Sequence, residues 1–283
     1  MSAPTRQLPD GLQLLNQTPP LRAYLAAIWE RREFALSMSA GEIRAKHMNT
    51  VLGSFWNLLN PLLSIGVYWL VFGQIIGTRR GVDNFVGFLS IGIFTYYYSQ
   101  RSFTGGANSI ANNLGLIRSL QFPRALLPLS AVLREATALR SAAIVVFGVL
   151  LWTGEGINWR WALVLPIVAL QSLFNLGGAL ILARLADKIR DISNVLPFLF
   201  RIMFYLSGVL FLVDRFVTDP TIKALFALNP FYCFVSLNRE YLMTSLDHEG
   251  VGWMWLSIAV WSLALSLVGL LVFRGGERSY GRG

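Results

Sequence analysis

Two aspartates, one helical turn apart in sequence, are the residues best placed for metal chemistry. If one helix carries both Asp187 and Asp191, their carboxylates could share a Mg²⁺ ion, because this ion prefers oxygen ligands. Intramembrane prenyltransferases use carboxylate clusters of this kind on lipid diphosphates. Lys188 and Arg190 adjoin the pair, however, and the sequence has no second cytoplasmic aspartate cluster to complete a two-metal site. Salt bridges at the surface are the simpler interpretation.

Two charged residues, Glu135 and Arg201, fall near the middle of otherwise apolar stretches. A charge at the centre of a bilayer costs about 2.5–3.5 kcal/mol or more, so both side chains should face protein or water. Two interpretations remain open. Either they form an inter-helix ion pair that fixes packing, or Arg201 lies on a transport pathway and attracts an anionic diphosphate group.

A run of aromatic residues could bind sugars, because rings cover the apolar faces of sugars and tyrosine hydroxyls supply hydrogen bonds. The run contains Phe94, Tyr96, Tyr97, Tyr98 and Phe103. Consecutive residues point about 100° apart on a helix, so at most one or two of the tyrosines can face a channel. Anchoring at the membrane interface is the alternative for the others. The candidate pathway residues are Arg201, Glu135, Tyr96, Tyr97 and Trp56.

Side chains typical of catalysis are scarce. The chain has one cysteine, Cys233, and two histidines, His47 and His248, with no cluster that suggests zinc. No G-x-x-x-x-G-K-[ST] phosphate loop occurs either. We therefore predict no catalytic residue and no bound metal, and we do not expect this chain to be an enzyme.

The composition is that of a membrane protein. Of 283 residues, 54% are apolar and only 14% are charged, against about 25% in a soluble domain. Disorder is excluded by the same numbers. The net charge of +9 does not change this conclusion, and nucleic acid is not an expected partner.

Six apolar segments approach the 20 residues that cross a bilayer of about 30 Å. A seventh segment, 224–238, is broken by Asn229-Pro230, so we expect two half-helices that dip into the membrane as a re-entrant hairpin. The predicted fold class is therefore an all-α integral membrane protein. Its expected spans are about 56–77, 84–104, 125–153, 161–183, 192–213 and 251–273, the third being hardest to place.

The distribution of basic residues gives an orientation. With the N-terminus inside, fifteen Lys and Arg fall on cytoplasmic segments and six outside, which predicts a cytoplasmic-membrane protein with both termini in the cytoplasm. Residues 1–20 and 274–283 would be cytoplasmic tails, the first one disordered. Apolar residues at helical spacing in 21–55 predict an amphipathic helix in the headgroup plane or packed on a partner, followed by the segment that leads into the first span.

Four sequence blocks in order resemble the membrane subunit of ABC-2 type polysaccharide exporters. The first is Arg44-x-Lys46-x3-Thr50-Val51-Leu52-Gly53-x2-Trp56-x4-Pro61. The second joins Asn112-Asn113-x-Gly115-Leu116-Ile117-Arg118 to Phe122-Pro123-Arg124. The third is Arg190-Asp191-Ile192-x-Asn194 with Phe204-Tyr205-Leu206-Ser207-Gly208-Val209, and the fourth is Leu228-Asn229-Pro230-Phe231 with Arg239. Gly208 stands where the family tends to carry proline.

The resemblance implies a transport subunit that exports a lipid-linked glycan of the O-antigen, teichoic acid or galactan type. It implies a homodimer of this chain, a polyprenyl-diphosphate-linked substrate, surrounding lipids, and two copies of a separate ATPase that binds ATP and Mg²⁺; this chain would bind no cofactor.

We expect the ATPase to dock on Asn112–Pro123, although a loop on the membrane surface would look similar. Asn229, Pro230 and Phe231 would form the outer gate. An ABC-2 permease for a small amphipathic drug or lipid is the main alternative. The predicted ATPase-coupling residues are Leu114, Leu116, Ile117, Arg118, Phe122 and Pro123.

Overall fold

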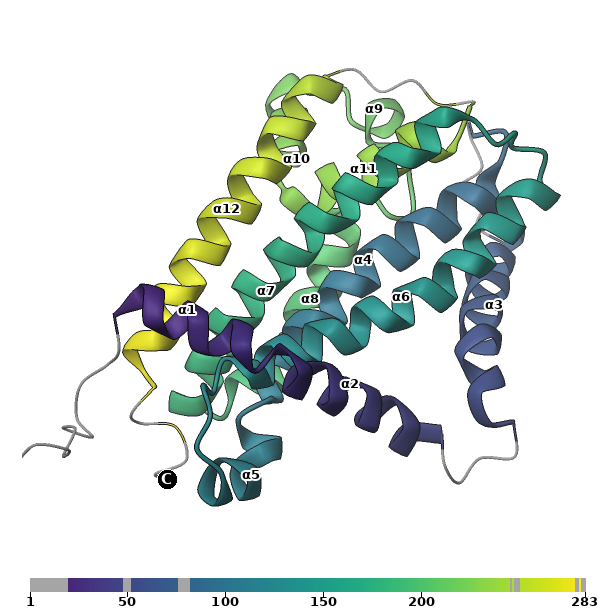
Figure 1. The fold of residues 1–283 in the computed structure, drawn as a ribbon. Helices are drawn as coiled ribbons and strands as arrows, with labels where there is room; N and C mark the ends of the chain where they lie inside the picture. Colours follow the sequence, from purple (N-terminus) through teal and green to yellow (C-terminus); the bar gives the residue numbers. More distant parts are fainter. Residues whose placement is uncertain are drawn as a thin grey trace, which may run out of the picture.

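The computed structural model describes residues 20–47, 52–75, 82–244, 246, 250–277 and 280, and the regular elements in these ranges are all helical (Figure 1). Nearly all of segment 1–20, for which we predict disorder, lies outside the described residues. The α-helices are α1 (Leu21–Glu30), α2 (Arg32–His47), α3 (Trp56–Tyr68), α4 (Phe85–Asn108), α5 (Leu114–Ser119), α6 (Leu126–Trp152), α7 (Val164–Lys188), α8 (Ile192–Leu206), α9 (Val213–Phe216), α10 (Pro220–Leu228), α11 (Pro230–Leu242) and α12 (Val251–Gly275).

Four helical segments in the described residues are long and apolar enough to cross a membrane: Leu58–Ile75, Leu126–Trp152, Trp159–Lys188 and Val251–Gly275. They overlap four of the predicted spans. In the segment Leu58–Ile75, α3 continues into a π-helical segment, η2 (Trp69–Ile75). In the segment Trp159–Lys188, a 3-10 turn, η4 (Trp159–Leu163), leads into α7. The third predicted span, which is the hardest to place from sequence, is one continuous helix of 27 residues, α6. It is about 40 Å long at 1.5 Å per residue.

Helix α4 occupies the predicted second span but is more polar than a lipid-facing helix, because it lies inside the bundle. It packs against α6, α7, α8 and α11 (Figure 1). Its polar side chains bond to α7: Gln171 Nε2 donates to Thr95 O and to Ser99 Oγ, both at 2.8 Å, and the hydroxyls of Tyr98 and Ser172 are 2.7 Å apart. Buried polar groups need such partners.

Helices α7 and α12 pack through their backbones. A Cβ added to Gly177 would lie 2.4 Å from the carbonyl carbon of Leu265, and one added to Gly269 would lie 2.4 Å from Gly177 O. Ser262 Oγ also donates to Leu170 O at 2.8 Å. Small residues and interhelical hydrogen bonds of this kind drive helix association in membranes.

The fifth predicted span, 192–213, is not one helix. Helix α8 ends at Leu206, and Gly208 follows with φ +61°, a left-handed conformation that favours glycine. The chain then runs without regular structure to α9, so the apolar run Val209–Leu212 extends the segment without extending the helix. Hydropathy alone registers the apolar run and misses the turn.

The break predicted at Asn229-Pro230 is present. Helices α10 and α11 meet there, and both are too short to cross a bilayer. Asn229 connects three segments: its Oδ1 accepts from the Phe231 amide at 3.0 Å, and its Nδ2 donates to Leu206 O at the end of α8 at 2.9 Å. Pro230 takes the first position of α11, where its missing N–H costs nothing.

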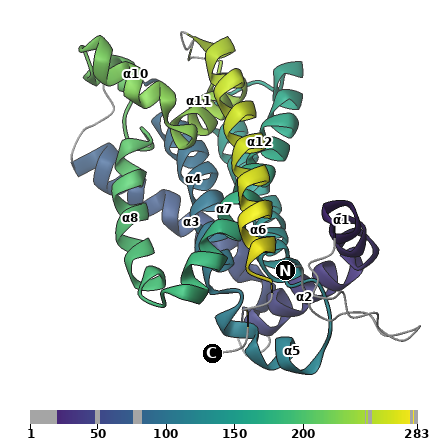
Figure 2. The ribbon, with the colours of Figure 1, turned by 90° about the vertical axis from the view of Figure 1, so that its left-hand side faces the viewer.

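The N-terminal amphipathic region forms two helices that cross one end of the bundle (Figures 1 and 2). They meet at Arg31, and α2 packs on α6. Tyr24 of α1 is buried beside the C-terminal residues Glu277 and Tyr280. The described part of the predicted C-terminal tail is therefore packed on the protein.

Candidate functional site

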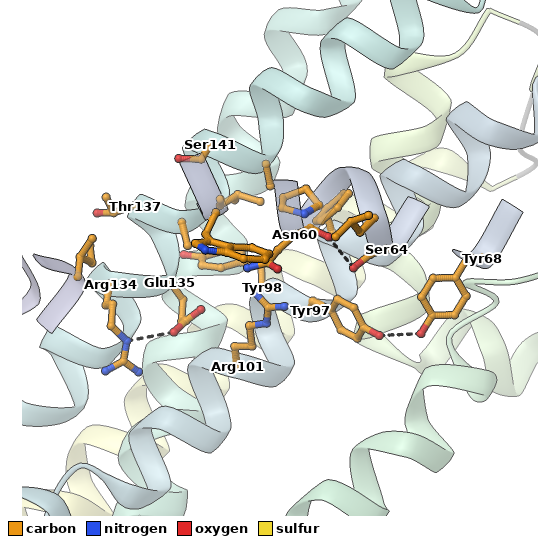
Figure 3. Close-up of a pocket in the computed structure, with 18 of the residues that line it drawn as sticks. Asn60, Ser64, Tyr68, Tyr97, Tyr98, Arg101, Arg134, Glu135, Thr137 and Ser141 are labelled. Carbon is orange, nitrogen blue, oxygen red and sulfur yellow. Dashed lines mark hydrogen bonds and ion pairs between the residues drawn. The ribbon is translucent and has the colours of Figure 1, made fainter. Parts of the chain in front are cut away.

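A pocket of about 620 Å³ lies among α2, α3, α4 and α6 (Figure 3). Its size is that of a small-molecule site. One wall comes from α3, with Trp56, Asn60 and Ser64; the opposite walls come from α4 and α6, with Arg101 and Glu135. It therefore combines aromatic, hydroxyl, amide and charged groups.

The two arginines of this pocket differ in their surroundings. Arg134 Nε bonds to Glu135 Oε1 at 3.1 Å, and its Nη1 forms an ion pair with Glu42 of α2. No carboxylate among the described residues forms an ion pair with Arg101, whose guanidinium lies 5.3 Å from the Tyr97 ring centroid. Arg101 is thus the cation of this pocket that an anionic ligand can approach.

Hydroxyl groups continue the polar wall towards the other end of the pocket. The hydroxyls of Tyr68 and Tyr97 are 2.7 Å apart, joining α3 to α4 (Figure 3). Ser64 Oγ donates to Asn60 O at 2.9 Å. These groups keep further hydrogen-bonding capacity for a ligand.

The structure brings three of the five candidate pathway residues together. Trp56, Tyr97 and Glu135 line the pocket, whereas Tyr96 is buried and donates a hydrogen bond to Phe200 O. Arg201 is exposed on α8 and forms no ion pair within the described residues. The inter-helix ion pair in this region is instead Arg134–Glu42, with Glu135 bound to its own helix neighbour.

The predicted coupling segment forms a short 3-10 turn and helix α5 at the same end as α1 and α2 (Figure 2). Ile117 is buried against the cluster that contains Tyr24, and the ring centroids of Phe122 and Phe34 are 5.0 Å apart. Leu114, Leu116 and Pro123 are half-buried, and Arg118 is exposed. Leu120, which the sequence did not single out, adds an exposed apolar side chain to this surface.

The predicted gate residue Phe231 is buried inside the bundle, in an aromatic cluster with Phe103, Phe174 and Phe200. Arg239 is one of the six basic residues that the charge count assigns to the outer side of the membrane; its side chain is 2% exposed and lies inside the protein. Its only sequence signal was its place after the Asn229-Pro230 break.

Comparison with known proteins identifies the family. The profile of the ABC-2 type transporter family matches residues 36–243. The chain belongs to this family. It is 27% identical to the O-antigen export system permease protein RfbA of Myxococcus xanthus over 224 residues, 78% of this chain and 84% of that protein. It is 25% identical to RfbA of Klebsiella pneumoniae over 82% of this chain and 87% of that protein. It is 24% identical to the polysialic acid transport protein KpsM of Escherichia coli, over 84% of this chain and 91% of that protein.

An ABC-2 permease works with a separate ABC ATPase subunit, and the relatives named above are export and transport proteins. The structure also removes the geometric basis for a metal site at Asp187 and Asp191. Helix α7 ends at Lys188, and Ile189 is extended, so the two aspartates do not share a helix. Asp187 Oδ2 lies 3.6 Å from Arg184 Nη1, in an ion pair within α7. The described residues contain no cluster of three or more His, Cys, Asp or Glu side chains that could hold a metal ion.

Proposed function

We propose that this ABC-2 permease exports a lipid-linked cell-envelope polysaccharide of the O-antigen, teichoic acid or galactan type across the cytoplasmic membrane. Two copies enclose the path, and ATP hydrolysis on two separate subunits drives it. O-antigen cargo has the most direct support, because the named RfbA relatives are O-antigen export permeases.

The observation that carries the proposal is the position of Arg201. It lies on an exposed face of α8 whose other members are large and apolar, among them Phe198, Leu199 and Ile202. Such a face suits lipid or another protein, but an arginine in its middle is costly in lipid. If a second copy of the chain lies opposite α8 and the two enclose a water-filled path, Arg201 is not exposed to lipid. Its positive charge can then attract an anionic cargo.

The membrane topology proposed here has six crossings. Helices α3, α4, α6, α7 and α12 provide five. Helix α8 is about 22 Å long at 1.5 Å per residue, and the irregular segment after it completes the sixth within the protein. Helices α10 and α11 form the re-entrant hairpin and outer gate. The excess of basic residues at the α1–α2–α5 end supports a cytoplasmic position for both termini, with α5 facing the ATPase.

Replacing Arg201 tests this function. We expect Arg201→Ala to lower glycan export about tenfold or more and to cause lipid-linked glycan to accumulate inside the cell, because the cargo loses its cation on the path. Arg201→Lys should retain most export. Surface glycan is measured by immunoblotting, and assembly with the ATPase by native mass spectrometry.

Arg215→Ala is the matched control, because Arg215 is an exposed arginine on a different helix, the short α9. Normal export by Arg201→Ala would contradict the proposal, as would a purified complex that contains a single copy of this chain. Transport of a small amphipathic drug without any glycan export would favour the alternative cargo.

A further inference from the structure

We propose that the pocket among α2, α3, α4 and α6 binds the sugar-phosphate part of a lipid-linked glycan. Arg101 contacts the phosphate, and Trp56 and Glu135 hold the first sugar ring. The inference rests on the proposed function and names the part of the cargo that this chain recognises.

The phosphate position follows from the charges. Arg134 already shares its charge with Glu135 and Glu42, whereas Arg101 contacts a tyrosine ring and has no ion-pair partner among the described residues. A guanidinium binds phosphate through paired N–H groups. Figure 3 shows Arg101 and Glu135 reaching from α4 and α6 towards the same space. An anion therefore binds at the Arg101 side and is repelled from the Glu135 side.

The groups beyond Arg101 suit a sugar better than a phospholipid headgroup. A sugar ring presents several hydroxyls and an apolar face, which need hydrogen-bond partners and an aromatic surface. The pocket supplies a carboxylate, an amide and an indole ring from Glu135, Asn60 and Trp56. Hydroxyls come from Ser64, Tyr68, Tyr97, Thr137 and Ser141. A phosphoethanolamine or phosphoglycerol group would leave most of these without a ligand partner.

The pocket also has a place for the start of the lipid chain. Leu63 and Val67 of α3 line it and are 53% and 60% exposed. They lie on a segment apolar enough to span the membrane. A prenyl chain can follow this face while its diphosphate stays at Arg101.

Binding to the purified permease–ATPase complex in nanodiscs tests the site. The probe is farnesyl diphosphate carrying one N-acetylglucosamine, compared with farnesyl diphosphate alone and with a phosphate-free farnesyl glycoside. Arg101→Gln should weaken the full probe about tenfold and leave the weak binding of the phosphate-free glycoside unchanged. Trp56→Ala should remove the advantage of the sugar-bearing probe over farnesyl diphosphate. Arg215→Gln, on α9, should bind like the unchanged protein.

The location is checked by thiol protection in a Cys233→Ser background. The probe should slow maleimide labelling of Ser141→Cys, which lines the pocket, but not of Ile144→Cys, which is exposed on the same helix outside it. Equal protection by phosphatidylethanolamine, equal affinity for farnesyl diphosphate with and without the sugar, or no effect of Arg101→Gln would each overturn the inference. If the cell still exports its glycan in those cases, only the inference fails; absence of glycan export by the unchanged protein removes the proposed function itself.

Discussion

At the residue scale, Arg239 is the largest fully buried side chain in the described part of the chain. Its guanidinium donates to Phe88 O at 3.1 Å, Gly208 O at 2.8 Å and Val209 O at 2.6 Å, and it lies 3.3 Å from the Phe88 ring centroid. The end of α8 leaves carbonyls without helical partners, and the five donors of one arginine can satisfy several. Arg239 therefore holds the irregular chain after α8 against α4.

Replacing Arg239 should destabilise the protein strongly. We expect Arg239→Gln to lower the free energy of unfolding by about 3–5 kcal/mol, because buried carbonyls lose their partners and a cavity forms. The midpoint of thermal unfolding in detergent measures this loss. Gly92→Ala should act in the same direction, since the added Cβ would lie 2.3 Å from Arg239 Nη2. Lys223→Gln, which removes a charge from a half-buried side chain of α10, is the control. An unchanged midpoint for Arg239→Gln would refute this role.

At the element scale, sequence alone could predict helices wherever apolar length decides the outcome. The sequence predicts α6, α7, α12 and the break before Pro230. Each depends only on nearby residues: the length of an apolar run that spans a bilayer, or a proline that cannot continue a helix. Sequence alone could not foresee the early end of α8, which depends on Gly208 and on an arginine 31 residues away. Nor could the sequence predict which tyrosine faces the pocket: Tyr96 is buried in the bundle, whereas Tyr97 lines the pocket.

The contact between α7 and α12 gives a prediction at this scale. Gly269→Leu should destabilise the protein by about 1–3 kcal/mol or more, because its Cβ meets backbone atoms of Gly177 that cannot rotate away. Gly252→Leu is a matched control on the same helix, since nothing lies within 4 Å of a Cβ there. Thermal unfolding of the two variants should differ clearly. Similar midpoints would mean that the helices can separate at little cost.

At the scale of the whole molecule, contacts distant in sequence meet at the end that carries α5. Tyr24 donates to Glu277 Oε2 at 2.5 Å, and the amide of Arg124 donates to Glu277 Oε1 at 2.8 Å. Arg31 Nη1 also donates to Gln121 O at 2.5 Å. The N-terminal helices, the segment between α5 and α6, and the residues after α12 thus form one connected unit. A displacement of α5 by a partner would reach α1, α2 and α12 through these bonds.

This junction should make stability depend on pH. Burial raises the pKa of Glu277, while the hydrogen bonds from Tyr24 and the Arg124 amide lower it only in part. The folded protein therefore binds this proton more tightly than the unfolded chain, and the free energy of unfolding falls as pH rises above the usual range of a glutamate. Tyr24 stays protonated and keeps donating, because burial and the nearby Glu277 raise its pKa. Glu277→Gln should flatten the pH dependence of the thermal midpoint above the usual titration range of a glutamate, relative to the unchanged protein. An identical pH profile for the two proteins would show that the carboxyl does not titrate with folding, and an increase in the midpoint with pH that disappears in Glu277→Gln would reverse the assigned sign.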